Sequence, residues 1–128
     1  MAARDIYVSP LFLGRRAAVE RTCSRWFVLS AKHGLLRPDE LIAPYDQRLG
    51  ASSAAQRREW SVAVLNSLET AIGLLTGFTF EIHAGADYRD WGLASGLAAR
   101  GATVLVPTLG LGIGRQLEFY KGLGEAKT

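Results

Sequence analysis

Three short apolar runs stand out along the chain. They cover residues 26–30, 78–83 and 102–107, and each is rich in aromatic or β-branched residues. Each run ends at a polar residue, a proline or a glycine-containing loop. Runs of this length and composition are typical of strands that are buried in a sheet, so we expect three strands at these positions.

The segments between these runs carry apolar residues at helical spacing. The clearest is 54–76, where apolar residues recur from Trp60 to Leu75 every three or four positions. Ser53 precedes it and Gln56 follows three positions later, which is the pattern of a capping box. Further helices are expected over residues 10–24, 87–100 and 114–121, with Gly77, Gly101 and Gly122 ending the last three helices of the chain.

The alternation of strands and helices predicts the fold class. Strands that are joined through helices pair in parallel by right-handed crossovers, and helices then cover both faces of the sheet. We therefore expect an α/β fold: a three-layer, doubly wound single domain over residues 1–128 with a small, mainly parallel sheet. Three strands make a small sheet, and Asp5–Val8 is the candidate for a fourth.

Composition narrows the class of protein. The 128 residues are 48% hydrophobic and 21% charged, which favours a folded chain over a disordered one. The formal net charge of +3 suits anionic ligands but is too small to indicate nucleic-acid binding by itself. Cys23 is the single cysteine, which fits a reducing compartment, and no apolar stretch is long enough to span a membrane. We expect a soluble cytoplasmic protein with no membrane partner.

The loop after the first expected strand carries the densest polar chemistry. In open parallel sheets, ligands bind beyond the carboxyl ends of the strands. Here Ser30, Lys32 and His33 offer a hydroxyl, a cation and an imidazole within four residues. The same loop continues through Gly34 to Tyr45 and Asp46, whose carboxylate would serve as a general base, a ribose acceptor or a counter-ion. The alternative is a solvated turn in which Gly34 supplies a positive φ.

The loops after the other two strands supply the remaining candidates. His83 ends the second strand, Gly85 would let a ligand approach the backbone, and Tyr88 would stack on a base or pack under the loop. After the third strand, alternate glycines lead into a helix, whose amides suit a phosphate or carboxylate. The candidate residues of this third loop are Gly110, Gly112, Gly114, Arg115 and Gln116. Its alternative role is a close-packed turn between helix and sheet.

Some kinds of site are not predicted. Two histidines and one cysteine at scattered positions match no zinc spacing, so we expect no metal and no cofactor. The spacing of the glycines matches neither a P-loop nor a dinucleotide fingerprint, and there is no nucleophile elbow. A polar or acid–base site remains.

Four blocks of the chain together resemble a known family. The sequence is similar to bacterial, archaeal and phage domains related to YaaA and to a domain of archaeosine synthase. The resemblance lies in residues 7–12, in 26–36 with 44–46, in 83–85 with 88–89, and in Pro107 with 109–114 and 116–117. It implies a link to nucleic acids and modified bases. Such domains usually begin with one more strand and a polar loop, which this chain is expected to lack.

These observations lead to one main hypothesis and two alternatives. The main one is an enzyme acting on a nucleobase, nucleoside, nucleotide or modified nucleic acid, hydrolytic or N-glycosidic, with Lys32, Asp46 and His83 as its catalytic set. The first alternative is a non-catalytic DNA- or RNA-binding module of a modification or stress-response system. Its phosphate contacts would be Arg15, Arg16, Arg48, Arg57 and Arg58. The second is a scaffold whose sheet edge is completed by a partner subunit or a second copy.

Overall fold

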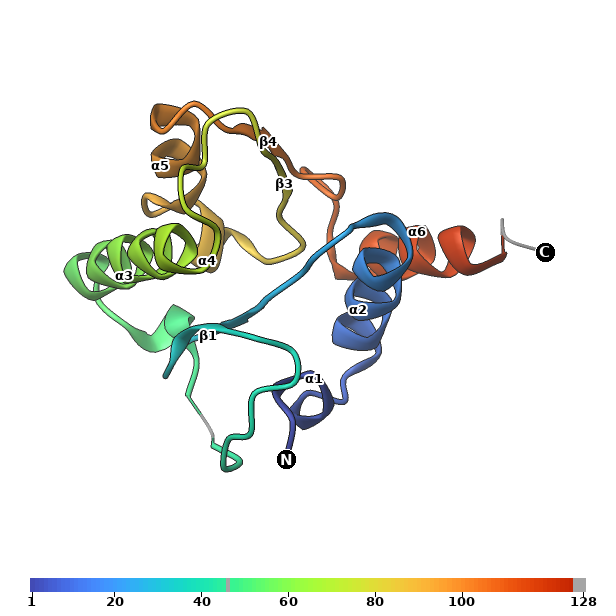
Figure 1. Cartoon of the computed structure of the whole chain (residues 1–128). Helices are drawn as coiled ribbons and strands as arrows, with labels where there is room; N and C mark the ends of the chain where they lie inside the picture. Colours follow the sequence, from blue (N-terminus) through green and yellow to red (C-terminus); the bar gives the residue numbers. More distant parts are fainter. Residues whose placement is uncertain (46, 126–128) are drawn as a thin grey trace. The chain divides into compact units, whose positions relative to one another are not determined.

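The chain folds into helices and short strands that form two compact units, each described below by itself. The computed structural model describes residues 1–45 and 47–125, without the side chain of residue 125. Unit 1 comprises Met1–Val28, Arg37–Pro44 and the segment from Thr108 onward, and unit 2 comprises Leu29–Leu36 and Tyr45–Pro107 (Figure 1). Among the described residues, no helix has both the length and the apolarity that crossing a membrane requires.

Unit 1 is built on two helices that pack side by side. They are α2 (Pro10–Thr22) and α6 (Ile113–Glu125). Their close approach depends on Gly14, because a Cβ atom there would lie 2.8 Å from the Cβ of Tyr120. The hydroxyl of Ser9 caps α2 by accepting the amide of Phe12.

The first residues of unit 1 differ from the expected strand. Asp5–Val8 was the candidate for a fourth strand, and this is wrong, because Ala3–Ile6 form the short helix α1. Tertiary contacts hold this turn: the guanidinium of Arg16 donates to the carbonyl of Arg4 and to the carboxylate of Asp5, both at 3.0 Å.

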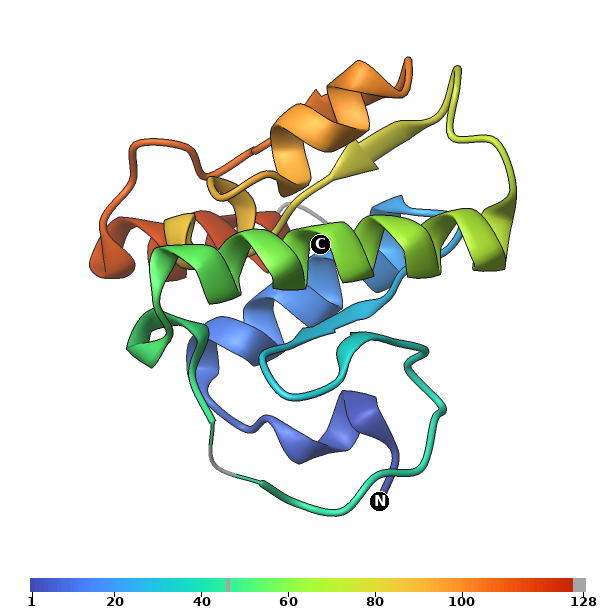
Figure 2. The ribbon, with the colours of Figure 1, turned by 90° about the vertical axis from the view of Figure 1, so that its left-hand side faces the viewer.

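Unit 2 contains the strands and the central helix α3. Its elements are β1 (Val28–Ser30, whose first residue belongs to unit 1), β2 (Gly34–Leu36), the 3-10 turn η1 (Leu49–Ala51), α3 (Ala54–Ile72), β3 (Thr79–Glu81), α4 (Ala86–Arg89), α5 (Leu93–Ala99) and β4 (Thr103–Leu105). α5 packs on α3 and against β4 (Figure 2). Leu68 and Leu97 are buried in this core.

The sheets confirm a mixed α/β protein with parallel pairing, in a smaller form than expected. β3 and β4 pair in parallel, with Phe80 opposite Val104. β1 pairs with β2 in a second two-stranded sheet, whereas the sequence predicts one sheet containing β1, β3 and β4. The sequence predicts a loop at Gly34–Leu36, whereas the structure has a strand there, which pairs with β1. The three-layer wound arrangement stays a prediction.

The helices occupy the expected segments, with different ends. The capping box of α3 is confirmed, because Ser53 and Gln56 exchange both hydrogen bonds. This helix ends at Ile72 and not near Gly77, since Gly73 has φ 92°. The helix expected over 87–100 is interrupted between α4 and α5, and α6 continues past Gly122.

Candidate functional site

Ser30 is the centre of the candidate site in unit 2. It is the last residue of β1 and has no solvent exposure. Its hydroxyl oxygen accepts the amide of His33 at 3.0 Å and shares a 2.5 Å hydrogen bond with the hydroxyl of Tyr45. Its carbonyl accepts the indole N–H of Trp60 at 2.8 Å. Both polar groups of Ser30 are therefore used to fix the surrounding loops.

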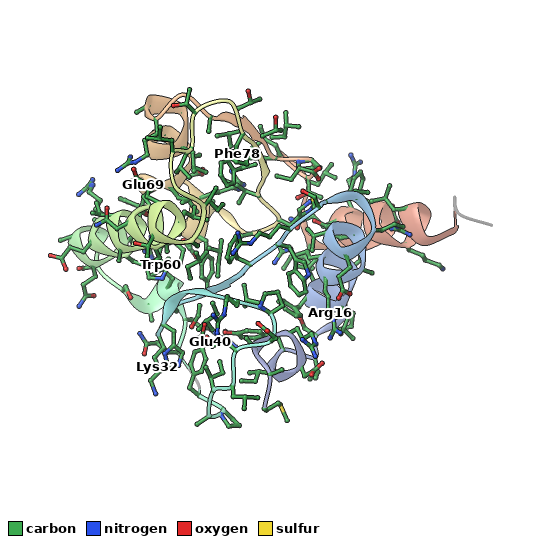
Figure 3. All side chains as sticks on the ribbon, viewed as in Figure 1. Arg16, Lys32, Glu40, Trp60, Glu69 and Phe78 are labelled. Carbon is green, nitrogen blue, oxygen red and sulfur yellow. The ribbon has the colours of Figure 1, made fainter. Side chains whose placement is uncertain are left out.

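Three polar side chains of the first loop gather around this serine. The imidazole of His33 meets the ring of Tyr45 edge-on, with ring centroids 5.4 Å apart. The ammonium of Lys32 (Figure 3) lies 5.8 Å from the same ring centroid. Both Lys32 and His33 are exposed. Gly34 has φ 75°, which the turn between β1 and β2 requires. The turn thus presents a cation, an imidazole and a phenol together.

Trp60 joins the first loop to the second. Besides its bond to Ser30, its ring packs edge-on against Tyr88 of α4, with centroids 5.4 Å apart. The sequence indicated Trp60 only as part of the apolar stripe of α3, so its role here was missed. A buried tryptophan needs an acceptor for its indole N–H, and that was the available signal.

The second loop brings His83 together with a carboxylate. His83 follows β3, its side chain is 6% exposed, and its Nε2 lies 3.0 Å from Oε1 of Glu81. Glu81 was not among the expected site residues, although residues two apart on a strand point to the same face. Gly85 precedes α4, and a Cβ added there would meet no atom within 4 Å. The backbone at Gly85 is therefore accessible.

The third loop belongs to unit 1 and is described there. Gly110 has φ 81°, and Gly112 and Gly114 have open space where a side chain would begin. Gln116 donates to the carbonyl of Leu111 at 2.8 Å and accepts from Arg15 at 3.1 Å. Gln116 is thus already bonded within unit 1. Arg115 is exposed.

Two arginines lie in α3 within one turn of Trp60, the residue that bonds to Ser30. Arg57, in the first turns of α3, donates to the carbonyls of Leu49 (3.2 Å) and Gly50 (2.7 Å). Its guanidinium also lies 3.4 Å from the carboxylate of Asp87 at the start of α4. Both Arg57 and Arg58 lie over the ring of Trp91, which was not an expected site residue.

Contacts among these side chains connect most candidates of unit 2 into one region, whereas the contact described for His83 is to Glu81. The strand-end face, as we call it, comprises Ser30, Lys32, His33, Tyr45, Gln47, Arg48, Arg57, Arg58, Trp60, Gly85, Asp87, Tyr88 and Trp91. Asp46 lies outside the described residues. Within the described ranges, no three His, Cys, Asp or Glu side chains gather to hold a metal ion.

Arg15 and Arg16, which the sequence suggests as phosphate contacts, form hydrogen bonds and ion pairs within unit 1. Arg16 is bonded to Asp5 and Glu20 in unit 1, and Arg15 to Gln116. Burial lowers the pKa of Arg16, but hydrogen bonds to the two carboxylates outweigh burial and raise it above its ordinary value. Both side chains therefore have structural partners within unit 1.

Comparisons with known proteins assign no activity. A model described as "Family of unknown function (DUF6884)" matches residues 1–122. An uncharacterized protein of Bacillus subtilis (strain 168), YfjM, is similar over 49 residues at 41% identity, which is 38% of this chain and 33% of YfjM. The chain thus spans about a third of the length of that relative. No solved structure matches the chain significantly.

Proposed function

The chain belongs to DUF6884, a family of unknown function, and from this premise we propose that it is an enzyme acting on a nucleotide-type ligand at the strand-end face of unit 2. The ligand class is a nucleobase, nucleoside or nucleotide, free or within a nucleic acid. The reaction class is hydrolysis, with an N-glycosidic bond as the bond that we favour. The proposal includes the three-layer wound arrangement, in which ligands bind beyond the strand ends.

One observation carries the proposal: the arrangement of Lys32, His33 and Tyr45 around buried Ser30. An aromatic ring offers a stacking surface for a base, and a neighbouring ammonium suits a phosphate or an electron-rich ring. Because Ser30 bonds both Tyr45 and the backbone of His33, these groups are held before a ligand arrives. The resemblance to YaaA-related domains favours the same ligand class.

The proposed chemistry needs two proton transfers. In N-glycosidic hydrolysis a water oxygen bonds to C1′, the bond from C1′ to the base nitrogen breaks, and that nitrogen keeps the electron pair and takes a proton. The attacking water loses a proton to a general base. His83, which is bonded to Glu81, is one candidate for these transfers, and Asp46 is the other. Lys32 holds the anionic group.

A binding experiment tests the proposal. Bases, nucleosides and nucleotides are titrated into the protein and followed by amide chemical shifts in NMR spectra. Tyr45→Leu should weaken binding by about tenfold, because base stacking on an aromatic ring contributes about 1–3 kcal/mol, whereas Tyr45→Phe should retain the stacking surface. Lys32→Ala should weaken nucleotide binding, and the matched control Lys121→Ala, an exposed lysine of unit 1, should not. Equal binding by all four variants would refute the proposal.

The non-catalytic nucleic-acid module remains as a second candidate because of one observation. Arg48 and Arg58 are exposed and have no acidic partner among the described residues. A module that binds through many phosphates loses affinity steeply with salt, whereas an enclosed nucleotide site does not. Turnover of a nucleotide with a shallow salt dependence favours the enzyme, and steep salt dependence without turnover favours the module.

A further inference from the structure

Unit 2 carries a shallow, open depression at the 3-10 turn η1. It encloses about 500 Å³ and is lined by Gln47, Arg48, Ala51 and Ser52. Gln47 and Arg48 precede η1, Ala51 is its last residue, and Ser52 leads directly into Ser53, the N-cap of α3. Three of the four lining residues carry polar or charged side chains, which can bond to a hydrated or charged ligand.

The electrostatics of the depression favour an anion. Arg48 is exposed and no carboxylate among the described residues pairs with it. The guanidinium of Arg57 donates hydrogen bonds to the carbonyl oxygens of Leu49 and Gly50, so the partial negative charge of these two nearby oxygens is already balanced. The positive end of α3, a helix of 19 residues, lies at Ser53. These three features each raise the local potential.

Asp87 reaches η1 and is already paired. A Cβ added at Gly50 would lie 2.8 Å from Oδ2 of Asp87, so this carboxylate reaches η1. Its other oxygen lies 3.4 Å from Arg57, and Asp87 therefore balances the charge of that arginine. Within residues 1–45 and 47–125, no carboxylate forms an ion pair with Arg48 or Arg58, and Arg58 lies over the ring of Trp91.

The depression adjoins the proposed base site. The side-chain amide of Gln47 donates to the carbonyl of Ala31 at 3.4 Å. Ala31 begins the turn that carries Lys32 and His33, so the wall of the depression is bonded to the wall of the base site. A ligand with an aromatic and an anionic part could occupy both.

We propose that this depression is a phosphate subsite in which Arg48 is the principal ligand-binding residue, assisted by the hydroxyl of Ser52 and the amide of Gln47. The inference rests on the proposed function, because it assigns the phosphate-bearing part of the same nucleotide-type ligand. The phosphate belongs to a monoester of a free nucleotide or to a phosphodiester of a strand, and Arg58 would contact the next phosphate only in a strand.

The test measures binding of four probes to the full chain and to single variants by NMR titration. The probes are inorganic phosphate, a nucleoside monophosphate, the matching unphosphorylated nucleoside and a short single-stranded oligonucleotide, each at two salt concentrations. Arg48→Ala should weaken binding of the phosphate-bearing probes by about fivefold. This factor corresponds to the loss of about 1 kcal/mol, which is typical of a charge contact that is partly exposed to solvent. Arg37→Ala is the matched control, since Arg37 is an exposed arginine of unit 1.

The outcomes separate the sources of phosphate. Arg48-dependent binding of inorganic phosphate and of the monophosphate indicates a monoester. Arg48-dependent binding of the oligonucleotide alone, with steep salt dependence and a further loss in Arg58→Ala, indicates a phosphodiester strand. Wild-type protein that binds none of the phosphate-bearing probes, or Arg48→Ala protein that binds them as tightly as wild type, overturns the inference.

The titration with the unphosphorylated nucleoside distinguishes the proposed phosphate subsite from the proposed function of the base site. A nucleoside that binds the wild type and Arg48→Ala equally, but not Tyr45→Leu, supports the base site independently of the subsite. If inorganic phosphate binds in an Arg48-dependent way and the nucleoside does not bind at all, the phosphate subsite stands and the proposed function fails.

Discussion

At the scale of single residues, Ser30 has the greatest structural effect on the candidate site. Its hydroxyl is fully buried and joins the backbone of His33 to the phenol of Tyr45. A buried hydroxyl that is bonded on both sides contributes stability and also fixes the directions of its partners. Ser30 thus acts on the site by positioning other groups.

Ser30→Ala should destabilise the protein by about 1–3 kcal/mol, because it removes the buried hydroxyl to which the His33 amide and the Tyr45 hydroxyl are bonded. Urea unfolding followed by circular dichroism measures the change. Ser67→Ala, at an exposed position of α3, is the control and should be close to neutral. A Ser30→Ala protein as stable as this control would show that the network contributes nothing to stability.

At the scale of elements, the break between α4 and α5 shapes the second loop. α4 ends at Arg89, and Gly92, the N-cap of α5, has φ 125°, a conformation that other residues rarely adopt. The apolar period of residues 87–100 continues through this break, so periodicity alone predicts one helix there. Gly92 interrupts this helix, because glycine adopts a positive φ that is incompatible with an α-helix.

Gly92→Ala should destabilise the protein by about 1–3 kcal/mol, the cost of holding a non-glycine residue in a sparsely populated backbone conformation. The added Cβ would also lie 3.4 Å from that of Ser61. Gly122→Ala provides the opposite control, because Gly122 lies within α6 with open space around it and alanine favours helix by about 1 kcal/mol. Melting temperatures that fall for Gly92→Ala and rise for Gly122→Ala confirm both arguments.

At the scale of the whole molecule, the two compact units are interleaved along the chain. Unit 1 is assembled from three separate segments, and β1 begins in one unit and ends in the other. No single cut of the chain therefore separates the units. Neither unit is continuous in sequence, so the segments of each unit are joined through residues that belong to the other unit. Folding of one unit therefore lowers the entropy cost of bringing together the segments of the other, which favours folding in one cooperative transition.

Gly14→Ala and Gly96→Ala test this cooperativity from each unit. The new methyl at position 14 would meet Tyr120 in unit 1, and that at position 96 would overlap the side chain of Leu65 in unit 2. Each should cost about 1–3 kcal/mol through overpacking. Both should lower the midpoint of one common transition, monitored by tryptophan fluorescence and circular dichroism together. Two resolved transitions, with each variant shifting only one, would contradict a single folding unit.

How far the site could be predicted also depends on scale. Ser30, Lys32, His33 and Tyr45 were found because polar residues follow a buried strand, and the structure does bring them together. The sequence analysis did not include Trp60, Glu81 and Trp91 in the site, because the pattern around each of them is typical of a hydrophobic core or of an ordinary solvent-exposed surface. The contacts of Trp60 and Trp91 are with residues far along the chain, whereas the spacing of Glu81 two residues before His83 was a local signal that was overlooked. The relation to YaaA-like domains and the nucleotide ligand stay predictions.

The sequence by itself determined the features that depend on near neighbours. These are the positions of β1, β3 and β4, the course of α3 and its capping box, all of which follow from side-chain period and local hydrogen bonds. Only the tertiary structure decided which strands pair, that residues 3–6 form a helix, and that Trp60 bonds to Ser30. The reason is physical: pairing and burial depend on groups that are distant in sequence, and local propensity is too weak to specify them.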